Sequence, residues 1–200
     1  MTHIDISNAP AYVINLPHRA DRMELFTKEA QKVGIKARRL AASPGGAAGA
    51  TKSHLEIVRI AKRNRLPFYI VFEDDAVFAD NFLTIFNNAR EIPDDWDAIY
   101  LGASYILDPV KRITESVVKS EAAYTLHAVV FHEKFYNKLI SIFDSAAAQN
   151  IPCDVALSNE HKNYNIYGYH PQIVFQRPGM SDITGKFEDY SFTLGAKKHL

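Results

Sequence analysis

The sequence contains one cysteine, Cys153, no apolar run of membrane-spanning length and no excess of either charge. A single cysteine excludes an intramolecular disulfide and favours a reducing compartment such as the cytoplasm. The longest apolar stretch, around residues 66–72, is far shorter than the ~20 residues that a membrane-spanning helix needs. Residues 1–10 contain neither a basic segment nor an apolar core, so we predict no signal peptide. We expect a soluble cytoplasmic protein whose contact with a membrane is at most peripheral.

The absence of net charge argues against one class of partner. Basic and acidic side chains both number 23, whereas proteins that bind nucleic acid usually carry a basic excess. The two signs are unevenly distributed along the chain, however. Residues 1–70 hold 12 basic and 5 acidic side chains, residues 71–110 hold 1 and 9, and residues 111–200 hold 10 and 9. A basic first third therefore precedes an acidic middle, and this asymmetry indicates a functional grouping of charge.

The length and composition are those of one ordinary globular domain. A chain of 200 residues buries roughly two-thirds to three-quarters of its unfolded surface, so it needs no metal or disulfide for stability. Hydrophobic residues make up 47% and charged residues 23%, which excludes intrinsic disorder. We predict a single domain over residues 1–200.

Short apolar runs alternate with segments of helical periodicity. The expected strands are 11–16, 35–40, 68–72, 97–101, 113–119, 123–131 and 172–176, and the expected helices are 20–33, 51–65, 81–90, 134–147 and 154–162. Residues 41–50 contain only Ala, Ser, Pro and Gly, so we predict a flexible loop there and a helix capped by Thr51. The alternation predicts an α/β fold whose sheet is parallel at least in its first half.

Three consecutive acidic residues, Glu73, Asp74 and Asp75, follow the most strand-like run of the chain. In open α/β sheets, ligands bind beyond the carboxyl ends of the strands. Extended backbone would place Glu73 and Asp75 on the same side, where two carboxylates repel each other unless a cation lies between them. Oxygen ligands suit Mg²⁺ or Mn²⁺ held together with substrate phosphates. The alternative is a solvated acidic turn.

Two arginines point to an anion near the same edge. Arg19 and Arg22 fall at the start of the first predicted helix, where the helix dipole disfavours cations. They are either solvated or part of an anion site that also uses the helix N-terminus. Together with a cation on the acidic triplet, such a site would suit a nucleoside diphosphate.

An ordered set of short motifs extends over residues 11–183. The set comprises 12–16 (YVINL) followed by Asp21 and Arg22, then Gly49 with Ser53 and His54, then 72–75 (FEDD), 96–102 (WDAIYLG), 127–128 (HA), 152–154 (PCD) and 181–183 (SDI). These motifs resemble, in the same order, those of glycosyltransferase family 25, the lipooligosaccharide-biosynthesis and procollagen galactosyltransferase group. The chain departs from the family pattern at Ala50 and Lys52, where the family has cysteine and leucine.

The resemblance implies a GT-A-like (Rossmann-like) fold with a mixed, largely parallel central sheet flanked by helices. It also implies an inverting hexosyltransferase, with UDP-galactose or UDP-glucose as the typical donor and Mn²⁺ or Mg²⁺ as cofactor. The acceptor would be a hydroxyl group of a glycan or a lipid-linked oligosaccharide, as in lipopolysaccharide biosynthesis.

The family motifs suggest roles for the acidic residues in this transfer. Asp75, with Glu73 as partner, is the candidate metal ligand, and Asp74 is the candidate for the donor ribose or sugar. A metal stabilises the departing diphosphate, while a general base must accept the proton of the acceptor hydroxyl. Asp154 is the first candidate for that base and Asp182 the second. The alternative role of Asp154, which follows a proline, is to cap a helix.

Candidate donor-binding residues complete the predicted site. Asn15, Arg19 and Arg22 would line the nucleotide and diphosphate, with His54 and His127 as further donor contacts. His127 is alternatively a hydrogen-bonded core histidine, and His54 alternatively caps its own helix.

Two other functions remain open from the sequence. The departures at Ala50 and Lys52 are compatible with a non-catalytic relative that binds a nucleotide sugar as a binding or scaffold module. A metal-dependent phosphohydrolase with the same acidic strand end is a weaker alternative. A basic group, Arg59, Lys62, Arg63 and Arg65, is either a solvated face or a contact to an anionic membrane.

Overall fold

The computed structural model describes residues 6, 8–87, 92–105 and 111–190, and in this part of the chain one large sheet organises the fold. Its strands are β1 (Ala11–Asn15), β2 (Ala37–Ala41), β3 (Phe68–Glu73), β5 (Ala98–Tyr105), β6 (Lys111–Arg112), β7 (Val117–Lys119), β8 (Ala123–His132) and β9 (Ile166–Tyr169). The strand order is β2-β1-β3-β8-β5-β9-β7-β6. Strands β8 and β7 run opposite to the other six, so the sheet is mixed but largely parallel in direction.

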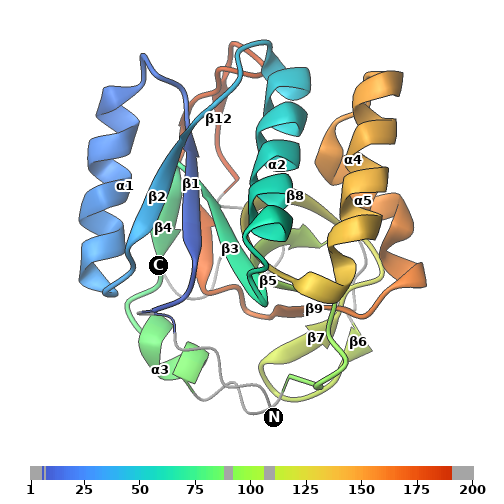
Figure 1. The fold of residues 1–200 in the computed structure, drawn as a ribbon. Coiled ribbons are helices and arrows are strands. Elements are labelled where there is room, and N and C mark those ends of the chain that lie inside the picture. Colours follow the sequence, from blue (N-terminus) through green and yellow to red (C-terminus); the bar gives the residue numbers. More distant parts are fainter. Residues whose placement is uncertain (1–5, 7, 88–91, 106–110, 191–200) are drawn as a thin grey trace.

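Helices cover both faces of this sheet (Figure 1). The helices are α1 (Ala20–Lys32), α2 (Gly46–Arg63), α3 (Phe82–Asn87), α4 (Tyr136–Gln149) and α5 (Cys153–Glu160). Strand alternation sends Tyr12 and Ile14 of β1 to the face covered by α2, α4 and α5, and Val13 to the face covered by α1 and α3. The predicted α/β architecture, with a mixed, largely parallel sheet flanked by helices, is confirmed.

The prediction of a loop over residues 41–50 is wrong for residues 46–50, because α2 begins at Gly46 rather than at Thr51. Alanine is the strongest helix former, and Ala47, Ala48 and Ala50 extend the helix by more than a turn at its N-terminal end. The chain enters the helix through Gly45 and Gly46, whose φ angles of 110° and 58° suit glycine.

Several short strands were missed. Strands β4 (Ala76–Phe78) and β10 (Val174–Gln176) pair with each other outside the large sheet, and β11 (Gly179–Met180) pairs with β12 (Phe187–Glu188). Of these only β10 falls on a predicted strand. β9 was also missed, although Tyr167 and Tyr169 on it are buried in the core.

The last part of the predicted helix 81–90 lies outside the described residues. No helix in the described ranges combines the length and apolarity needed to cross a bilayer.

Candidate functional site

A cavity of about 290 Å³ lies beyond the carboxyl ends of β1 and β3, at the edge where α1 and α2 begin. Six of the predicted site residues line it: Arg22, His54, Glu73, Asp74, Asp75 and Asp182. The remaining wall comes from Ile14, Leu16, His18, Ala42, Ser43, Pro44, Gly45, Gly46, Ala50, Gln176, Arg177, Gly179, Ser181, Ile183, Glu188 and Tyr190. The cavity thus brings the basic first part of the chain against the acidic middle.

Asp75 has a strongly perturbed carboxyl group. Burial raises its pKa to about 7, and the neighbouring charges of Glu73 and Asp74 raise it in the same direction. Its Oδ1 atom is buried and has no hydrogen-bond partner among the described residues. A buried carboxylate oxygen without a donor, beside two further carboxylates, is a position that a cation would stabilise.

Glu73 and Asp74 are held by different partners. Glu73 Oε1 lies 3.4 Å from Nε2 of the buried His54 on α2. Burial alone would raise the pKa of Glu73, but the His54 contact, with the charge of Arg22, lowers it. For Asp74 burial dominates and raises the pKa, despite hydrogen bonds from Asn15 Nδ2 (2.6 Å) and Arg22 Nη1 (3.1 Å).

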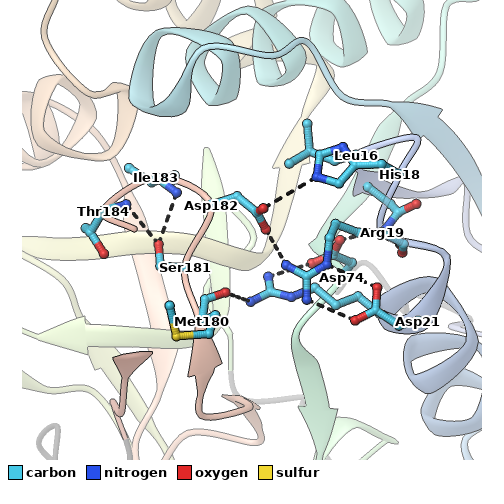
Figure 2. Close-up of polar contacts among 12 residues, drawn as sticks. Leu16, His18, Arg19, Asp21, Asp74, Met180, Ser181, Asp182, Ile183 and Thr184 are labelled. Carbon is cyan, nitrogen blue, oxygen red and sulfur yellow. Dashed lines mark hydrogen bonds and ion pairs between the residues drawn. The ribbon is translucent and has the colours of Figure 1, made fainter. Parts of the chain in front are cut away.

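The two arginines tie the start of α1 to the C-terminal hairpin, residues 179–188, which comprises β11, β12 and the turn between them. Arg22 Nη2 donates to the Met180 carbonyl at 2.7 Å, so its guanidinium bridges the hairpin and Asp74. Arg19 pairs with Asp182 through Nη1 and with Asp21. Figure 2 shows the carboxylate of Asp182 facing both His18 and Arg19. In Figure 1 the hairpin lies at the top, near the start of α2.

Arg19→Gln is expected to loosen the C-terminal hairpin without unfolding the protein. Partly exposed ion pairs contribute little to global stability, so the melting temperature should stay nearly unchanged. Amide hydrogen exchange in residues 179–188 should accelerate severalfold, because the Asp182 tie is lost. Arg59→Gln, which removes the remote pair with Asp144, is the matched control and should leave that exchange unchanged. Unaltered exchange in Arg19→Gln would show that the pair does not hold the hairpin.

A small-residue contact shapes the opposite wall of the cavity. Ser53 Oγ donates to the Gly49 carbonyl and accepts from the Ser43 amide, so α2 holds the preceding loop against itself. A Cβ atom at Gly49 would lie 2.3 Å from the Ser43 carbonyl oxygen and 2.6 Å from that of Pro44. The glycine is therefore required where this loop crosses the helix.

Gly49→Ala is expected to displace the cavity-lining loop and to destabilise the fold by roughly 1–3 kcal/mol, since backbone atoms must move. Urea unfolding measures the loss of stability. Lys52→Ala, on the exposed side of the same helix, is the control and should leave the unfolding midpoint near that of the original protein. A Gly49→Ala midpoint equal to the control would contradict the contact.

The other predicted site residues do not line the cavity. Asn15 donates a hydrogen bond to Asp74, and Arg19 forms an ion pair with Asp182, so each contacts a residue of the cavity wall. Asp154, in the first turn of α5, accepts through Oδ2 a hydrogen bond from the amide of Thr125, a residue with a φ of 69°. Both ring nitrogens of the buried His127 are engaged, by the hydroxyl of Thr125 (3.1 Å) and the carbonyl of Val174 (3.1 Å).

Several wall residues were missed by the sequence reasoning. The loop residues from Ser43 to Gly46 do carry a signal, because a glycine-rich loop before a helix often binds an anion, although their composition by itself predicts only a flexible loop. Tyr190 carried none. It lines the same cavity as the acidic strand end, and burial raises its pKa, with the charges of Glu188, Asp75, Glu73 and Asp154 acting in the same direction.

The carboxylates of the acidic strand end are suitable ligands for a hard divalent cation, but they do not form a complete coordination shell. The candidate ligands are carboxylate oxygens, and the unpartnered Asp75 oxygen is available to a cation. Within the described ranges no three His, Cys, Asp or Glu side chains converge in a group that could hold a metal ion. Mg²⁺ and Mn²⁺ are commonly held by one or two carboxylates with substrate phosphates completing the shell, and Asp75 fits that arrangement.

No protein-family model matches the chain, and no curated protein sequence matches it either. Its fold is similar to solved structures at low identity. A protein from STIV is 15% identical over 91% of this chain and 95% of that chain, with a TM-score of 0.47. A glycosyltransferase involved in glycosylation of the major capsid of PBCV-1 is 10% identical (77% and 76% covered, TM-score 0.46). A nucleoside-diphosphate-sugar pyrophosphorylase from Vibrio cholerae RC9 is 14% identical (86% and 77% covered, TM-score 0.45). At such values the similarities carry no conclusion about activity.

Proposed function

We propose that this chain is a metal-dependent hexosyltransferase that uses a UDP-sugar, with galactose or glucose as the sugar. The hexose would be transferred with inversion to a hydroxyl group of a glycan or a lipid-linked oligosaccharide. One observation carries the proposal: one cavity at the carboxyl ends of parallel strands holds both the guanidinium of Arg22 and the carboxyl group of Asp75, whose Oδ1 has no hydrogen-bond partner among the described residues. A nucleoside diphosphate with its cation needs both charges at one place.

Each residue of the strand end has a distinct role in this proposal. Asp75 would hold Mn²⁺ or Mg²⁺, with Glu73 as the second carboxylate, oriented by His54. The bound cation would offset the negative charge that develops on the departing diphosphate. Asp74, fixed by Asn15 and Arg22, would accept hydrogen bonds from hydroxyl groups of the donor.

Asp182 is the better placed of the two candidate bases, because it lines the cavity. Its Oδ2 atom is paired with Arg19, while Oδ1 lies 3.6 Å from His18 Nε2. Oδ1 would therefore receive the proton of the acceptor hydroxyl. Asp154 is better explained by its hydrogen bond from the Thr125 amide, which supports the unusual backbone of that residue.

Titration calorimetry with UDP-galactose and UDP-glucose, in Mn²⁺ and in EDTA, tests the proposal. We expect saturable binding of at least one UDP-sugar that requires the cation, and slow release of UDP when water replaces the acceptor. Absence of cation-dependent binding for both sugars would reject it. Binding without turnover over a broad acceptor panel would favour the non-catalytic relative, and release of inorganic phosphate rather than UDP would indicate a phosphohydrolase.

A further inference from the structure

The C-terminal hairpin exposes apolar side chains to an unusual degree. Met180, Ile183 and Phe187 are 54%, 54% and 66% exposed, and they are the three most exposed large hydrophobic residues of the described chain. The next, Tyr124, is 42% exposed and lies on β8. Single exposed apolar residues are ordinary, but three within eight residues form a patch that calls for an explanation.

One of the three side chains, that of Ile183, lines the cavity. Met180 and Phe187 are directly opposite each other in the β11–β12 pair, so their side chains share one face of the hairpin. Ile183, in the turn between the strands, is both exposed and part of the cavity wall. Through Ile183 the hairpin that carries these apolar side chains therefore reaches the space proposed for sugar transfer.

The way the hairpin is attached explains how this patch can face outward. A two-stranded hairpin normally needs a buried apolar face to stay folded against a protein. Here the attachment to α1 is polar instead: Arg22 binds the Met180 carbonyl and Arg19 binds Asp182. Because these polar contacts attach the hairpin, its apolar side chains stay available to a ligand.

We propose that the C-terminal hairpin binds the apolar aglycone of an amphiphilic acceptor, whose accepting sugar enters the cavity past Ile183. This inference rests on the proposed function. The position of Ile183 favours one molecule that touches both the patch and the cavity. Three side chains offer much less area than a stable dimer needs. Residues 179–190 carry three acidic side chains and one basic one, which disfavours an anionic bilayer.

Methionine methyl resonances provide a direct test, because the chain has three methionines, Met1, Met23 and Met180. The protein labelled at these methyl groups is titrated with octyl β-glucoside below its micelle concentration, and separately with methyl β-glucoside. We expect the Met180 signal to shift with the octyl compound at a roughly tenfold lower half-saturation concentration, since burying about two methylene groups suffices for that factor. Met23, on α1, should respond to neither compound.

Two variants make the result specific. Phe187→Ser removes the cross-strand neighbour of Met180 and should reduce the octyl-specific shift severalfold, while Leu25→Ser, at an exposed position on α1, should retain it.

Equal responses to both glucosides, or an octyl response that persists in Phe187→Ser, would overturn the proposal. A Met180 signal that changes with protein concentration alone would overturn it in favour of self-association, and a shift produced only by anionic vesicles in favour of a membrane. Failure of UDP-sugar binding, with the octyl response intact, would reject the enzymatic function but not the patch.

Discussion

Asp75→Asn is expected to abolish cation-dependent binding of the UDP-sugar and to lower the rate of transfer by roughly 100-fold or more. The substitution keeps the size of the side chain but removes the charge beside Glu73 and Asp74. Calorimetry with and without Mn²⁺ measures the binding, and the initial rate of UDP release measures the transfer.

The same substitution is expected to stabilise the protein in the absence of metal. The pKa of Asp75 is about 7 in the folded protein, against 3.8 for the unperturbed group. The folded state therefore holds this proton more tightly than the unfolded state, so the contribution of Asp75 is most favourable below about pH 4 and is lost as the pH rises toward 7. Above pH 7 the ionised carboxylate leaves a penalty on the order of 2–4 kcal/mol, which asparagine removes.

A pair of measurements separates these two effects. At pH 8 in EDTA, Asp75→Asn should melt at a higher temperature than the original protein, and added Mn²⁺ should raise only the melting temperature of the original protein. Asp144→Asn, an exposed carboxylate on α4, serves as the control and should alter neither result. If Asp75→Asn still responds to Mn²⁺ like the original protein, Asp75 is not a ligand of the cation.

The parts of the fold that were predictable are those where burial produces a long sequence signal. The apolar run at 68–72 became the central strand β3, and the helical spacing of Met23, Phe26 and Ala30 became α1 within one residue at its end. The missed strands β11 and β12 have only two residues each, too few for an alternation to be visible.

The candidate site was predictable where chemistry is carried by side chains in a recognisable local setting. Glu73, Asp74 and Asp75 were identifiable because they end an apolar strand, and Arg22 because it opens a helix. The bridge from Arg22 to the C-terminal hairpin was not, because its acceptor is the backbone carbonyl of Met180. Every residue carries a carbonyl, so its sequence position contains no signal for this contact. The pair of His54 with Glu73 likewise depends on how α2 lies on the sheet.

Gly102→Ala is expected to destabilise the fold strongly. A Cβ atom at this position of β5 would lie 2.0 Å from the Val174 carbonyl oxygen and 2.4 Å from His127 Nε2. The carbonyl belongs to the backbone of β10 and cannot rotate away, so strand β10 would have to move. We expect a loss of roughly 3 kcal/mol or more, measured by urea unfolding.

The physical reason lies in the hydrogen bonds that pass closely over this glycine. The Val174 carbonyl can only accept, so Nε2 of His127 carries the proton and Nδ1 accepts from the Thr125 hydroxyl. Burial lowers the pKa of His127, which agrees with this neutral form. Because Gly102 has no side chain, the His127 imidazole can hydrogen-bond to the Val174 carbonyl directly above β5, and this hydrogen bond holds β10 in place.

The displacement should reach the cavity as well, because the next residue after β10, Arg177, donates its amide to the Asp75 carbonyl at 2.8 Å. Gly102→Ala should therefore weaken UDP-sugar binding even in the fraction that remains folded. Gly179→Ala is the matched control: its Cβ would lie 3.7 Å from Arg22 Nη2, an ordinary contact, so it should unfold near the original midpoint. Equal unfolding midpoints for the two variants would mean that β10 can shift freely, and that the contact of His127 with Val174 does not position the acidic strand end.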